Sequence, residues 1–162
     1  MKIILMSDTH GVCDKKIEKY LSDCDEIWHA GDIGSLDVVN RLRSFATLRA
    51  VYGNIDDHNI RHEFPEFLSF QCEGISILIT HIGGFPGKYD TKALRQIFAI
   101  KPKIFVCGHS HILRVIYDQH FDMLTLNPGA AGLQGFHQVR TLLRFEIINA
   151  EIKNLEVIEI PR

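Results

Sequence analysis

Lys2-Ile-Ile-Leu-Met-Ser-Asp-Thr-His10 opens the chain and decides its fold. Its apolar residues run without polar alternation, which is typical of a strand buried on both faces of a sheet. A carboxylate, Asp8, and an imidazole, His10, follow at the point where such a strand ends. We therefore expect a buried strand over Lys2–Met6 that delivers two polar side chains to one edge of a sheet.

The same arrangement recurs at widely separated points in the chain. Polar residues follow further short apolar runs at Gly31-Asp32, Gly53-Asn54, Thr80-His81 and His109-Ser110-His111, with Asn127-Pro128-Gly129 after them. Residues so far apart in sequence meet only if the fold gathers the strand ends into one place. Carboxylate, imidazole and amide donors without a thiolate suit Mn, Fe, Zn, Co or Ni. The pattern therefore predicts a metal centre.

The first half of the chain alternates strands with helices. We expect strands over Lys2–Met6, Glu26–Ala30 and Leu48–Tyr52, and helices over Asp14–Ser22 and Ser35–Arg43, the second with Ser35 as its N-cap. This alternation favours parallel strands joined by right-handed crossovers. Ligands usually bind at the carboxyl ends of such strands, which is where the polar residues fall.

The second half has a different organisation, with more strands than helices. We expect strands over Phe67–Gln71 and Ser76–Thr80 around a Glu73-Gly74 turn, a helix over Thr91–Ile100, and strands over Ile104–Cys107, Leu113–Tyr117, Met123–Leu126, Thr141–Ile148 and Leu155–Ile160. Tight polar turns between the last strands indicate antiparallel pairing. Together the two halves predict an α/β fold, in which two mixed β-sheets pack as a sandwich flanked by helices. No repeat or linker interrupts residues 1–162, so we expect a single domain.

Composition sets modest bounds on function. The 162 residues are 46% hydrophobic and 23% charged, with a formal net charge of −2, which is ordinary for a globular domain. No basic stripe indicates binding to duplex DNA or to a membrane surface. The first apolar run is too short for a signal peptide, and no run approaches the roughly 20 residues of a membrane span. The four cysteines show no C-x-x-C spacing, so we expect a cytoplasmic protein without disulfides.

The spacing of the polar residues bears on how their side chains converge. Asp8 and His10 are two residues apart, as are His109 and His111. On extended segments, both members of each pair would point the same way. Helix capping competes with metal ligation at Asp8 and at Asp32, and turn formation competes with it at Asn54. The joint pattern favours metal ligation at all of these positions.

Several of these motifs resemble those of a known family. They are Asp8-x-His10, Gly31-Asp32, Gly53-Asn54-x-Asp56, His81 and Gly108-His109-Ser110-His111. Together they look like the calcineurin-like metallophosphoesterases, and more narrowly their small single-domain bacterial and archaeal phosphodiesterase branch. The resemblance covers residues 1–162. It implies a two-sheet sandwich flanked by helices and a metal-dependent hydrolase that acts on a small phosphoester substrate, most often a phosphodiester.

The resemblance also implies a ligand set for two divalent ions. One ion would be held by Asp8, His10, Asp32 and His111, and the second by Asp32, Asn54, His81 and His109. Asp32 would bridge them, and a hydroxide shared by the metals would attack phosphorus in line. Asp32, Asn54 and His109 would take part in catalysis. Manganese is the first choice, with Fe, Ni, Zn or Co as alternatives.

Two departures from the family pattern bear on mechanism. Many relatives have a histidine after the asparagine that is thought to protonate the leaving group, but this chain has Ile55 there. Aryl oxides and phosphorylated leaving groups need this proton less than alkoxides do. His58 is a weak candidate to replace it. The second departure is His81-Ile82-Gly83-Gly84, because the family more often has a glycine immediately after the histidine.

Other polar residues have weaker claims to a role. His29 is interpreted as a hydrogen-bonded residue at a strand end, and Asp56 either orients a ligand or simply belongs to a turn. The loop Gly83–Tyr89 is expected at the rim of the substrate pocket, with Lys88 and Tyr89 as weak candidates for phosphate contacts. His62, His120 and His137 are expected on the surface.

A non-catalytic role is the rival hypothesis. The scaffold subunit of the retromer coat keeps the metallophosphoesterase fold and binds proteins, and the missing histidine at position 55 gives that hypothesis some weight. The complete ligand set argues for the enzyme. The sequence does not identify the physiological substrate, the metal used in the cell or the oligomeric state, although exposed strands in the second half offer edges for pairing between subunits.

Overall fold

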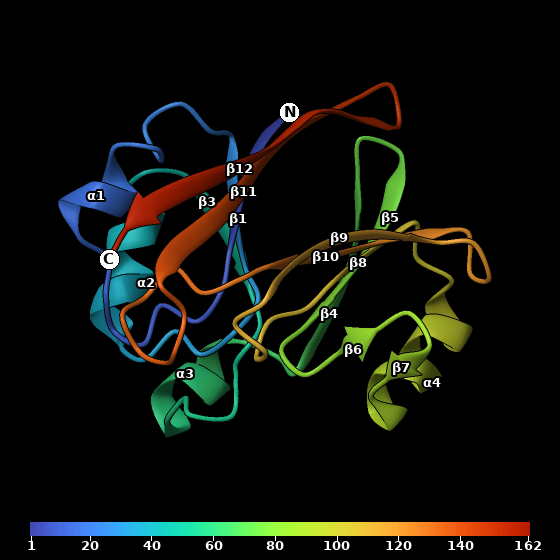
Figure 1. Ribbon diagram of the computed structural model, residues 1–162, viewed down its shortest axis with the longest axis horizontal. Coiled ribbons are helices and arrows are strands. Elements are labelled where there is room, and N and C mark those ends of the chain that lie inside the picture. The colour runs from blue at the N-terminus through green and yellow to red at the C-terminus, as the bar shows by residue number, and fades with distance from the viewer.

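The computed structural model describes residues 1–162 and contains two five-stranded sheets and a two-stranded hairpin. In Figure 1 the two large sheets lie side by side as the layers of a sandwich, with helices on their outer sides. The strands are β1 (Lys2–Met6), β2 (Glu26–His29), β3 (Thr47–Ala50), β4 (Phe67–Cys72), β5 (Ile75–Thr80), β6 (Gly84–Phe85), β7 (Lys88–Tyr89), β8 (Ile104–Val106), β9 (Leu113–Asp118), β10 (Met123–Pro128), β11 (Val139–Ile148) and β12 (Glu151–Pro161). The helices are α1 (Lys15–Glu18), α2 (Leu36–Arg43), α3 (His58–Glu63) and α4 (Thr91–Ile100).

The first sheet has the strand order β12-β11-β1-β2-β3. Strands β1, β2 and β3 run parallel, as the alternation of strands and helices predicts. Strand β11 pairs antiparallel with β1 and with β12, so the end of the chain completes the sheet begun by the first half. The carboxyl ends of the three parallel strands therefore lie next to one another.

The second sheet has the order β4-β5-β8-β10-β9. Its three central strands, β5, β8 and β10, are parallel, while β4 and β9 pair antiparallel at the two edges. This arrangement confirms the predicted sandwich of two mixed sheets. It also provides a second row of parallel strand ends.

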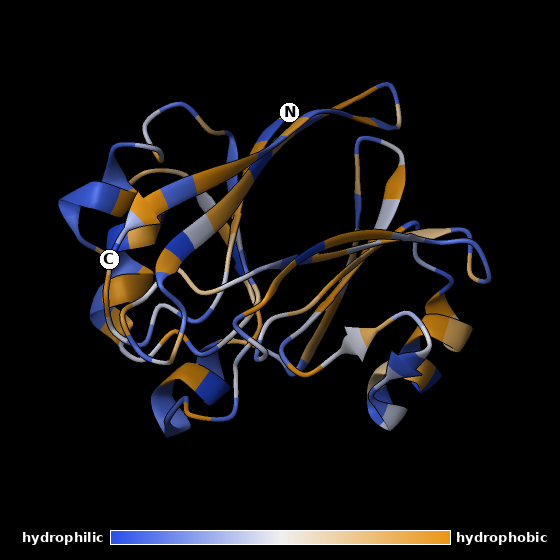
Figure 2. Ribbon diagram, viewed as in Figure 1, coloured by the Kyte–Doolittle hydropathy of each residue, from blue (hydrophilic) through white to orange (hydrophobic).

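Alternate residues of each central strand enter different parts of the core. In β1, Ile3 and Leu5 are fully buried against residues of β5 and β8 between the sheets. Ile4 and Met6 point the other way and pack under α1 and α2. Burying each such side chain contributes about 1.5–3 kcal/mol. Figure 2 shows hydrophobic residues concentrated along the strands, whereas α1 is mostly hydrophilic.

The helices agree with the prediction in part. The N-cap of α2 is Ser35, and α4 has the predicted bounds. Helix α1 is a single turn, so the helix expected over Asp14–Ser22 is wrong beyond Glu18. After that residue, a bond from Leu21 N to Glu18 O closes a tight turn that brings Leu21 inward within a short connection.

Several further elements differ from expectation. Helix α3 was not predicted, because only Ile60 of its residues is buried and no apolar period results. Strand β3 ends at Ala50 rather than Tyr52, since Tyr52 N leaves the ladder and donates to Pro65 O. Strands β6 and β7 form a small hairpin within the loop Gly83–Tyr89. None of the helices has the length and apolar character needed to cross a membrane.

Candidate metal centre

The polar residues that follow the central strands meet at one end of the sandwich. In chain order, the strands and the residues after them are β1 with Asp8 and His10, β2 with Asp32, β3 with Asn54, β5 with His81, and β8 with His109 and His111. The carboxyl ends of parallel strands open to the same side of a sheet. The structure thus brings all seven predicted ligands into one region, supplied by both sheets.

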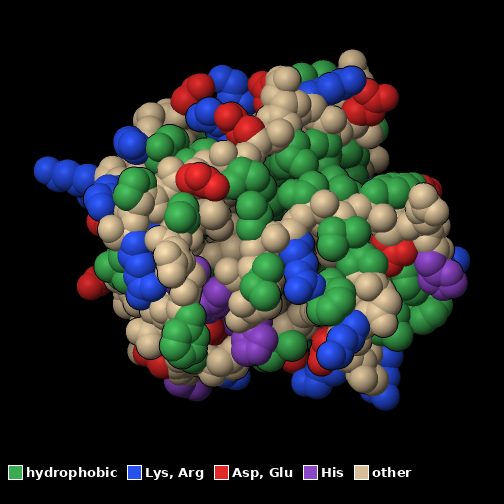
Figure 3. Space-filling model, in the orientation of Figure 1, with side chains coloured by type: hydrophobic (Ala, Val, Ile, Leu, Met, Phe, Trp, Pro, Cys, Tyr) green, Lys and Arg blue, Asp and Glu red, His purple; other side chains and the backbone are tan.

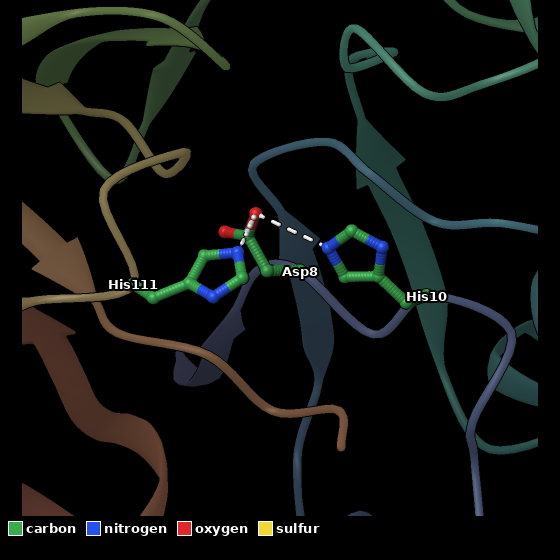
Figure 4. A group of neighbouring side chains, drawn as sticks. All are labelled: Asp8, His10 and His111. Atoms are coloured by element: carbon green, nitrogen blue, oxygen red, sulfur yellow. Dashed lines mark ion pairs between the residues drawn. The ribbon is translucent and has the colours of Figure 1, made fainter. Parts of the chain in front are cut away.

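The first cluster consists of Asp8, His10 and His111, whose ligand atoms lie within 4.8 Å of one another. Asp8 Oδ1 is 3.0 Å from His111 Nε2 and 3.8 Å from His10 Nε2. Figure 4 shows the Asp8 carboxylate between the two imidazole rings, which approach from opposite sides. One carboxylate and two imidazoles thus face a common point.

The second cluster consists of Asp32, His81 and His109, again with ligand atoms within 4.8 Å of one another. Asp32 Oδ1 is 3.3 Å from His81 Nε2, and Asn54 Oδ1 is 3.1 Å from the same nitrogen. The rings of His81 and His109 meet edge to face with centroids 5.2 Å apart. This cluster combines carboxylate, amide and imidazole donors.

Asp32 contacts both clusters. Its Oδ1 faces His81, while its Oδ2 lies 3.6 Å from His10 Nε2 in the first cluster. The Asp32 side chain is almost fully buried, and the N–H of Ile55 donates to Oδ1 at 3.1 Å. The two oxygens of one carboxylate are therefore aimed at different sets of ligands.

Most of these residues adopt an unusual backbone conformation. Positive φ angles occur at Asp8 (54°), His10 (46°), Asp32 (54°), His109 (67°) and His111 (58°). A left-handed conformation costs a non-glycine residue on the order of 1 kcal/mol. The expectation that extended segments align the side chains within each pair is wrong, because the chain turns at every one of these positions.

Backbone hydrogen bonds between neighbouring loops hold these turns. His10 N donates to Asp32 O at 3.0 Å, and Gly108 N donates to His81 O at 2.9 Å. Each bond continues a pairing of parallel strands beyond the point where the strands end. The conformation of the ligand loops is therefore imposed by the sheets.

Glycines and a backbone carbonyl set the position of the second cluster. His81 Nδ1 lies 2.7 Å from Ala30 O, so this nitrogen donates to the carbonyl and leaves the Nε2 lone pair for the site. A Cβ on Gly31 would lie 2.7 Å from the His81 ring, and one on Gly53 would lie 2.0 Å from Asp32 Oδ1. Glycine at these two positions therefore allows the close approach of the loops at the centre.

The clusters favour ionised carboxylates. Burial alone would raise the pKa of Asp8, but the neighbouring imidazoles of His10 and His111 outweigh it and hold that pKa well below its usual range. Burial likewise opposes ionisation of Asp32, and His81 outweighs it, so the pKa of Asp32 is lowered. The carboxylate of Asp8 raises the pKa of His111 in turn. Ionised carboxylates are the form that binds metal.

Two buried atoms in the first cluster are left without hydrogen-bond partners. They are Asp8 Oδ1, whose 3.0 Å approach to His111 Nε2 lacks hydrogen-bond geometry, and His10 Nε2. A buried polar atom without a partner costs about 1–3 kcal/mol. A carboxylate oxygen and an imidazole nitrogen can both donate a lone pair to a divalent cation, which would satisfy these atoms. The donor set and the orphaned atoms therefore fit a metal ion.

Asp56 braces the loops that carry the ligands. Its Oδ2 accepts from Ile33 N at 3.1 Å and from Gly53 N at 2.8 Å, and its Oδ1 accepts from Gly34 N at 2.7 Å. These bonds tie the loop after β2 to the loop after β3. Of the two interpretations of Asp56, orientation of the ligand loops is the one that these contacts favour.

His29 lies behind the centre with both ring nitrogens engaged. Nε2 is 2.9 Å from Thr9 Oγ1, and Nδ1 accepts from Gly31 N at 3.2 Å. Burial lowers the pKa of His29 to about 4. The prediction of a hydrogen-bonded histidine at a strand end is confirmed, and its partners include the loop that presents Asp32.

The weaker candidates occupy varied positions. Lys88 is exposed, whereas the Tyr89 hydroxyl donates to Asp118 Oδ2 at 2.7 Å and is held against the second sheet. His58 is exposed at the start of α3, where its ring lies 6.3 Å from that of His62.

Two of the three histidines expected on the surface are exposed, and the third is only partly exposed. His62 and His120 are exposed. His137 is only partly exposed, and its ring packs edge-on at 5.5 Å from His111 with Nε2 2.9 Å from Gly132 O. Its surface assignment is therefore wrong, because the loop before β11 folds back over the first cluster.

Two cavities, each of about 330 Å³, adjoin the second cluster. The first is lined by Asn54, Arg61, His81 and Lys92 among others, and the second by Lys88, His109 and Arg114 among others. Ile82 belongs to both walls. In Figure 3 histidine side chains reach the surface at the lower centre of the face shown, with Lys or Arg side chains beside them. Sequence reasoning missed Arg61 and Arg114, since neither belongs to a motif.

Comparison with known proteins supports the resemblance found in the sequence. Residues 1–150 match the calcineurin-like phosphoesterase superfamily domain. The chain is 31% identical over 137 residues to a probable metallophosphoesterase of Methanothermobacter thermautotrophicus. The matched stretch covers 80% of this chain and 77% of that protein.

Solved structures share the fold over nearly the whole chain. An archaeal phosphodiesterase superimposes with a TM-score of 0.73 at 25% identity, covering 99% of this chain and 100% of that one. Vps29 of Chaetomium thermophilum gives a TM-score of 0.77 at 16% identity, covering 99% and 97%. The likeness to Vps29 shows the fold alone. The domain match and the archaeal relative together establish that the chain belongs to the calcineurin-like phosphoesterase superfamily.

Proposed function

We propose that this chain is a phosphodiesterase that depends on two divalent metal ions. The observation that carries the proposal is the position of Asp32, whose two oxygens face His81 and His10 in separate clusters. A carboxylate shared in this way offsets the repulsion between two dications about 3.5–4 Å apart. The family relationship supports phosphoester hydrolysis.

Each cluster supplies ligands for one ion. The first ion would be held by Asp8, His10, Asp32 and His111, and the second by Asp32, Asn54, His81 and His109. When bound, divalent ions supply Lewis-acid stabilisation of phosphoryl oxygens and activate water at neutral pH. The oxygen and nitrogen donors suit manganese first, with Fe, Ni, Zn or Co as alternatives.

The chain's own residues orient the substrate. Asn54 and His109 are exposed at the mouth of the centre, so they contact the phosphoryl group as it enters. In the reaction, the oxygen of a water molecule bonds to phosphorus while the bond to the leaving oxygen breaks on the opposite side. The proton of the water passes to solvent. No covalent bond to the protein is needed.

The residue after Asn54 restricts the leaving group. The Ile55 side chain is exposed and carries no proton to donate. An alkoxide would therefore leave slowly, whereas an aryl oxide or a phosphorylated group departs as a stable anion. We infer a preference for activated leaving groups.

The two cavities support a diester rather than a monoester. They lie on either side of Ile82 and both adjoin ligands of the second cluster. A diester has two organic substituents on one phosphorus, and each cavity accommodates one of them. A monoester would fill a single cavity.

A protein-binding scaffold is the alternative function. The observation in favour of this alternative is that the chain shares its fold with Vps29. A scaffold, however, has no need for seven ligands or for the left-handed backbone at five of them.

Elemental analysis and an activity screen test the proposal together. The purified chain should bind two dications and hydrolyse bis(p-nitrophenyl) phosphate after addition of manganese, and excess EDTA should abolish the activity. Metal binding without hydrolysis across a panel of phosphodiesters and monoesters would favour the scaffold. Failure to bind any dication would contradict both the metal centre and the enzyme.

A further inference from the structure

The cavity beside His109 has a composition suited to an anion. Its walls include Ile82, Phe85, Lys88, His109, Ser110 and Arg114. The residues come from the loop after β5, the hairpin β6–β7, the loop after β8 and strand β9. The cavity thus extends from a ligand of the second cluster toward two cationic side chains.

The two cations in this cavity, Lys88 and Arg114, form no ion pair with an acidic side chain. The single acidic side chain in the wall is Asp90. Its Oδ2 accepts from the backbone amides of Lys92 and Ala93 at 2.9 and 3.2 Å, so this carboxylate already caps α4. The cavity retains a net positive charge.

Arg114 is held in place by an aromatic ring. Its Cζ lies 4.0 Å from the centroid of Phe85, so the planar guanidinium stacks on the ring. Stacking leaves the N–H groups along the guanidinium edge free, and that edge matches a phosphate or carboxylate in a bidentate manner. The arginine is therefore preorganised to bind an anion.

The cavity on the other side of Ile82 differs in this respect. Lys92 is paired with Glu66 at 3.1 Å. Arg61 Nε donates to Asp56 O at 2.7 Å and its Nη2 to Asn54 O at 3.1 Å, so it is bound to the loop backbone. In that cavity Lys92 is ion-paired and Arg61 is hydrogen-bonded to the loop backbone, so the two cations without an ion-pair or hydrogen-bond partner lie on the Arg114 side.

We propose that Arg114, assisted by Lys88, binds a second anionic group of the substrate, so that the preferred diester carries a phosphate or carboxylate on one arm. The inference rests on the proposed function and deepens it, because it assigns one cavity to a charged arm. Arg114 is then the residue that determines specificity between charged and neutral arms.

Ligand binding tests this directly without relying on turnover. Isothermal titration calorimetry of the manganese-loaded protein would compare thymidine 3′,5′-bisphosphate with thymidine 5′-monophosphate. The second phosphate should tighten binding by about 10-fold or more, the value of one charge-assisted pair. In Arg114→Met, which keeps packing against Phe85, the ratio of the two dissociation constants should fall to about 2 or less, a residual left by Lys88.

Matched variants separate this contact from general charge effects. Arg95→Met removes an exposed cation of α4 that lines neither cavity, and it should leave the ratio unchanged. Lys88→Met should lower the ratio partially and serves as the deciding variant if Arg114→Met does not fold. A ratio near one in the wild type, or an unchanged ratio in the deciding variant, would overturn the proposal. Because binding is measured independently of hydrolysis, a failure of the proposed function would appear separately in the activity screen.

Discussion

Asp32 Oδ1 lies 3.3 Å from His81 Nε2, although the two residues belong to different sheets. Asp32 follows β2 in the first sheet, and His81 follows β5 in the second. The contact joins the two layers of the sandwich at the point where the ligands converge. Any displacement of one sheet relative to the other would therefore separate the ligands of the second cluster.

Replacing Asp32 with Ala should remove the carboxylate that faces both clusters and that we propose is shared by two metal ions. We expect bound metal to fall by at least half and activity toward bis(p-nitrophenyl) phosphate to fall on the order of 10³-fold. Asp37→Ala, an exposed acidic residue of α2, is the control and should retain both. Elemental analysis and steady-state kinetics measure the outcome. Wild-type activity in Asp32→Ala would refute the assignment of the centre.

Asp56→Ala should weaken metal binding although Asp56 is not itself a ligand. The change removes acceptors from three backbone amides in the loops beside Asp32 and Asn54. We expect metal affinity to fall by about 10–100-fold, as is usual when a group that orients ligands is lost. Isothermal titration calorimetry, with the metal as titrant, measures this change in metal affinity.

Asp57→Ala provides the matched control for this effect. The Asp57 side chain caps α3 by accepting from Ile60 N and forms no hydrogen bond with the other residues of the ligand loops. Its replacement should lower stability by about 1 kcal/mol, the usual value of an N-cap, and leave metal affinity unchanged. Equal losses of metal affinity in the two variants would mean that stability, not loop orientation, controls the site.

Ile55→His should extend activity to poorer leaving groups. Ile55 is exposed beside Asn54, so an imidazole fits there without repacking the core. We expect kcat for methyl p-nitrophenyl phosphate to change little, because its p-nitrophenolate group leaves without a proton. For dialkyl phosphodiesters we expect kcat to rise by about 10²-fold, which is the lower end of the range for general acid catalysis. No gain with dialkyl esters would indicate that another group already donates the proton.

His29 should make the metal-free protein less stable in acid. Burial lowers the pKa of His29 from 6.5 unfolded to about 4 folded. Between these values the unfolded chain binds more protons, so stability falls as pH falls through this window. The loss amounts to about 3 kcal/mol at most.

Comparison with His29→Gln isolates this contribution. Other groups titrate in the same range, but they are common to both proteins. Urea unfolding in EDTA, at several pH values between the folded and unfolded pKa of His29, should show a smaller loss for the variant. Parallel stability curves for the two proteins would show that His29 is not the source of the acid sensitivity.

Much of the fold could be predicted from the sequence because its central strands are buried on both faces. Strand β1 has the predicted bounds, since a short uninterrupted apolar run that ends at polar residues is typical of a buried strand. Helix α4 was equally clear, with a capping aspartate before it and Pro102 after it. The candidate ligands could be located because they are polar residues at strand ends, and the structure brings those residues together.

Other features depend on contacts that the sequence does not display. The left-handed turns at Asp8 and His10 arise from pairing with a distant loop, so local spacing suggested an extended segment instead. The position of His137 near His111 depends on how a loop folds back. Arg114 gains its significance from a stack with Phe85 that links separate elements. Side chains defined by tertiary contacts of this kind leave no periodic signal.

The interloop bonds beneath the ligands have a consequence for how the centre fluctuates. Asp8 N donates to Gly31 O, and Ala131 N donates to Ser7 O, so amides at and beside the candidate ligands continue the hydrogen bonding of the sheets beyond the strand ends. Because these bonds continue strand pairings, we expect them to break together with the strands they extend, and their hydrogen exchange should be as slow as that of the core. The lifetime of the ligand geometry is therefore the lifetime of the folded sheets.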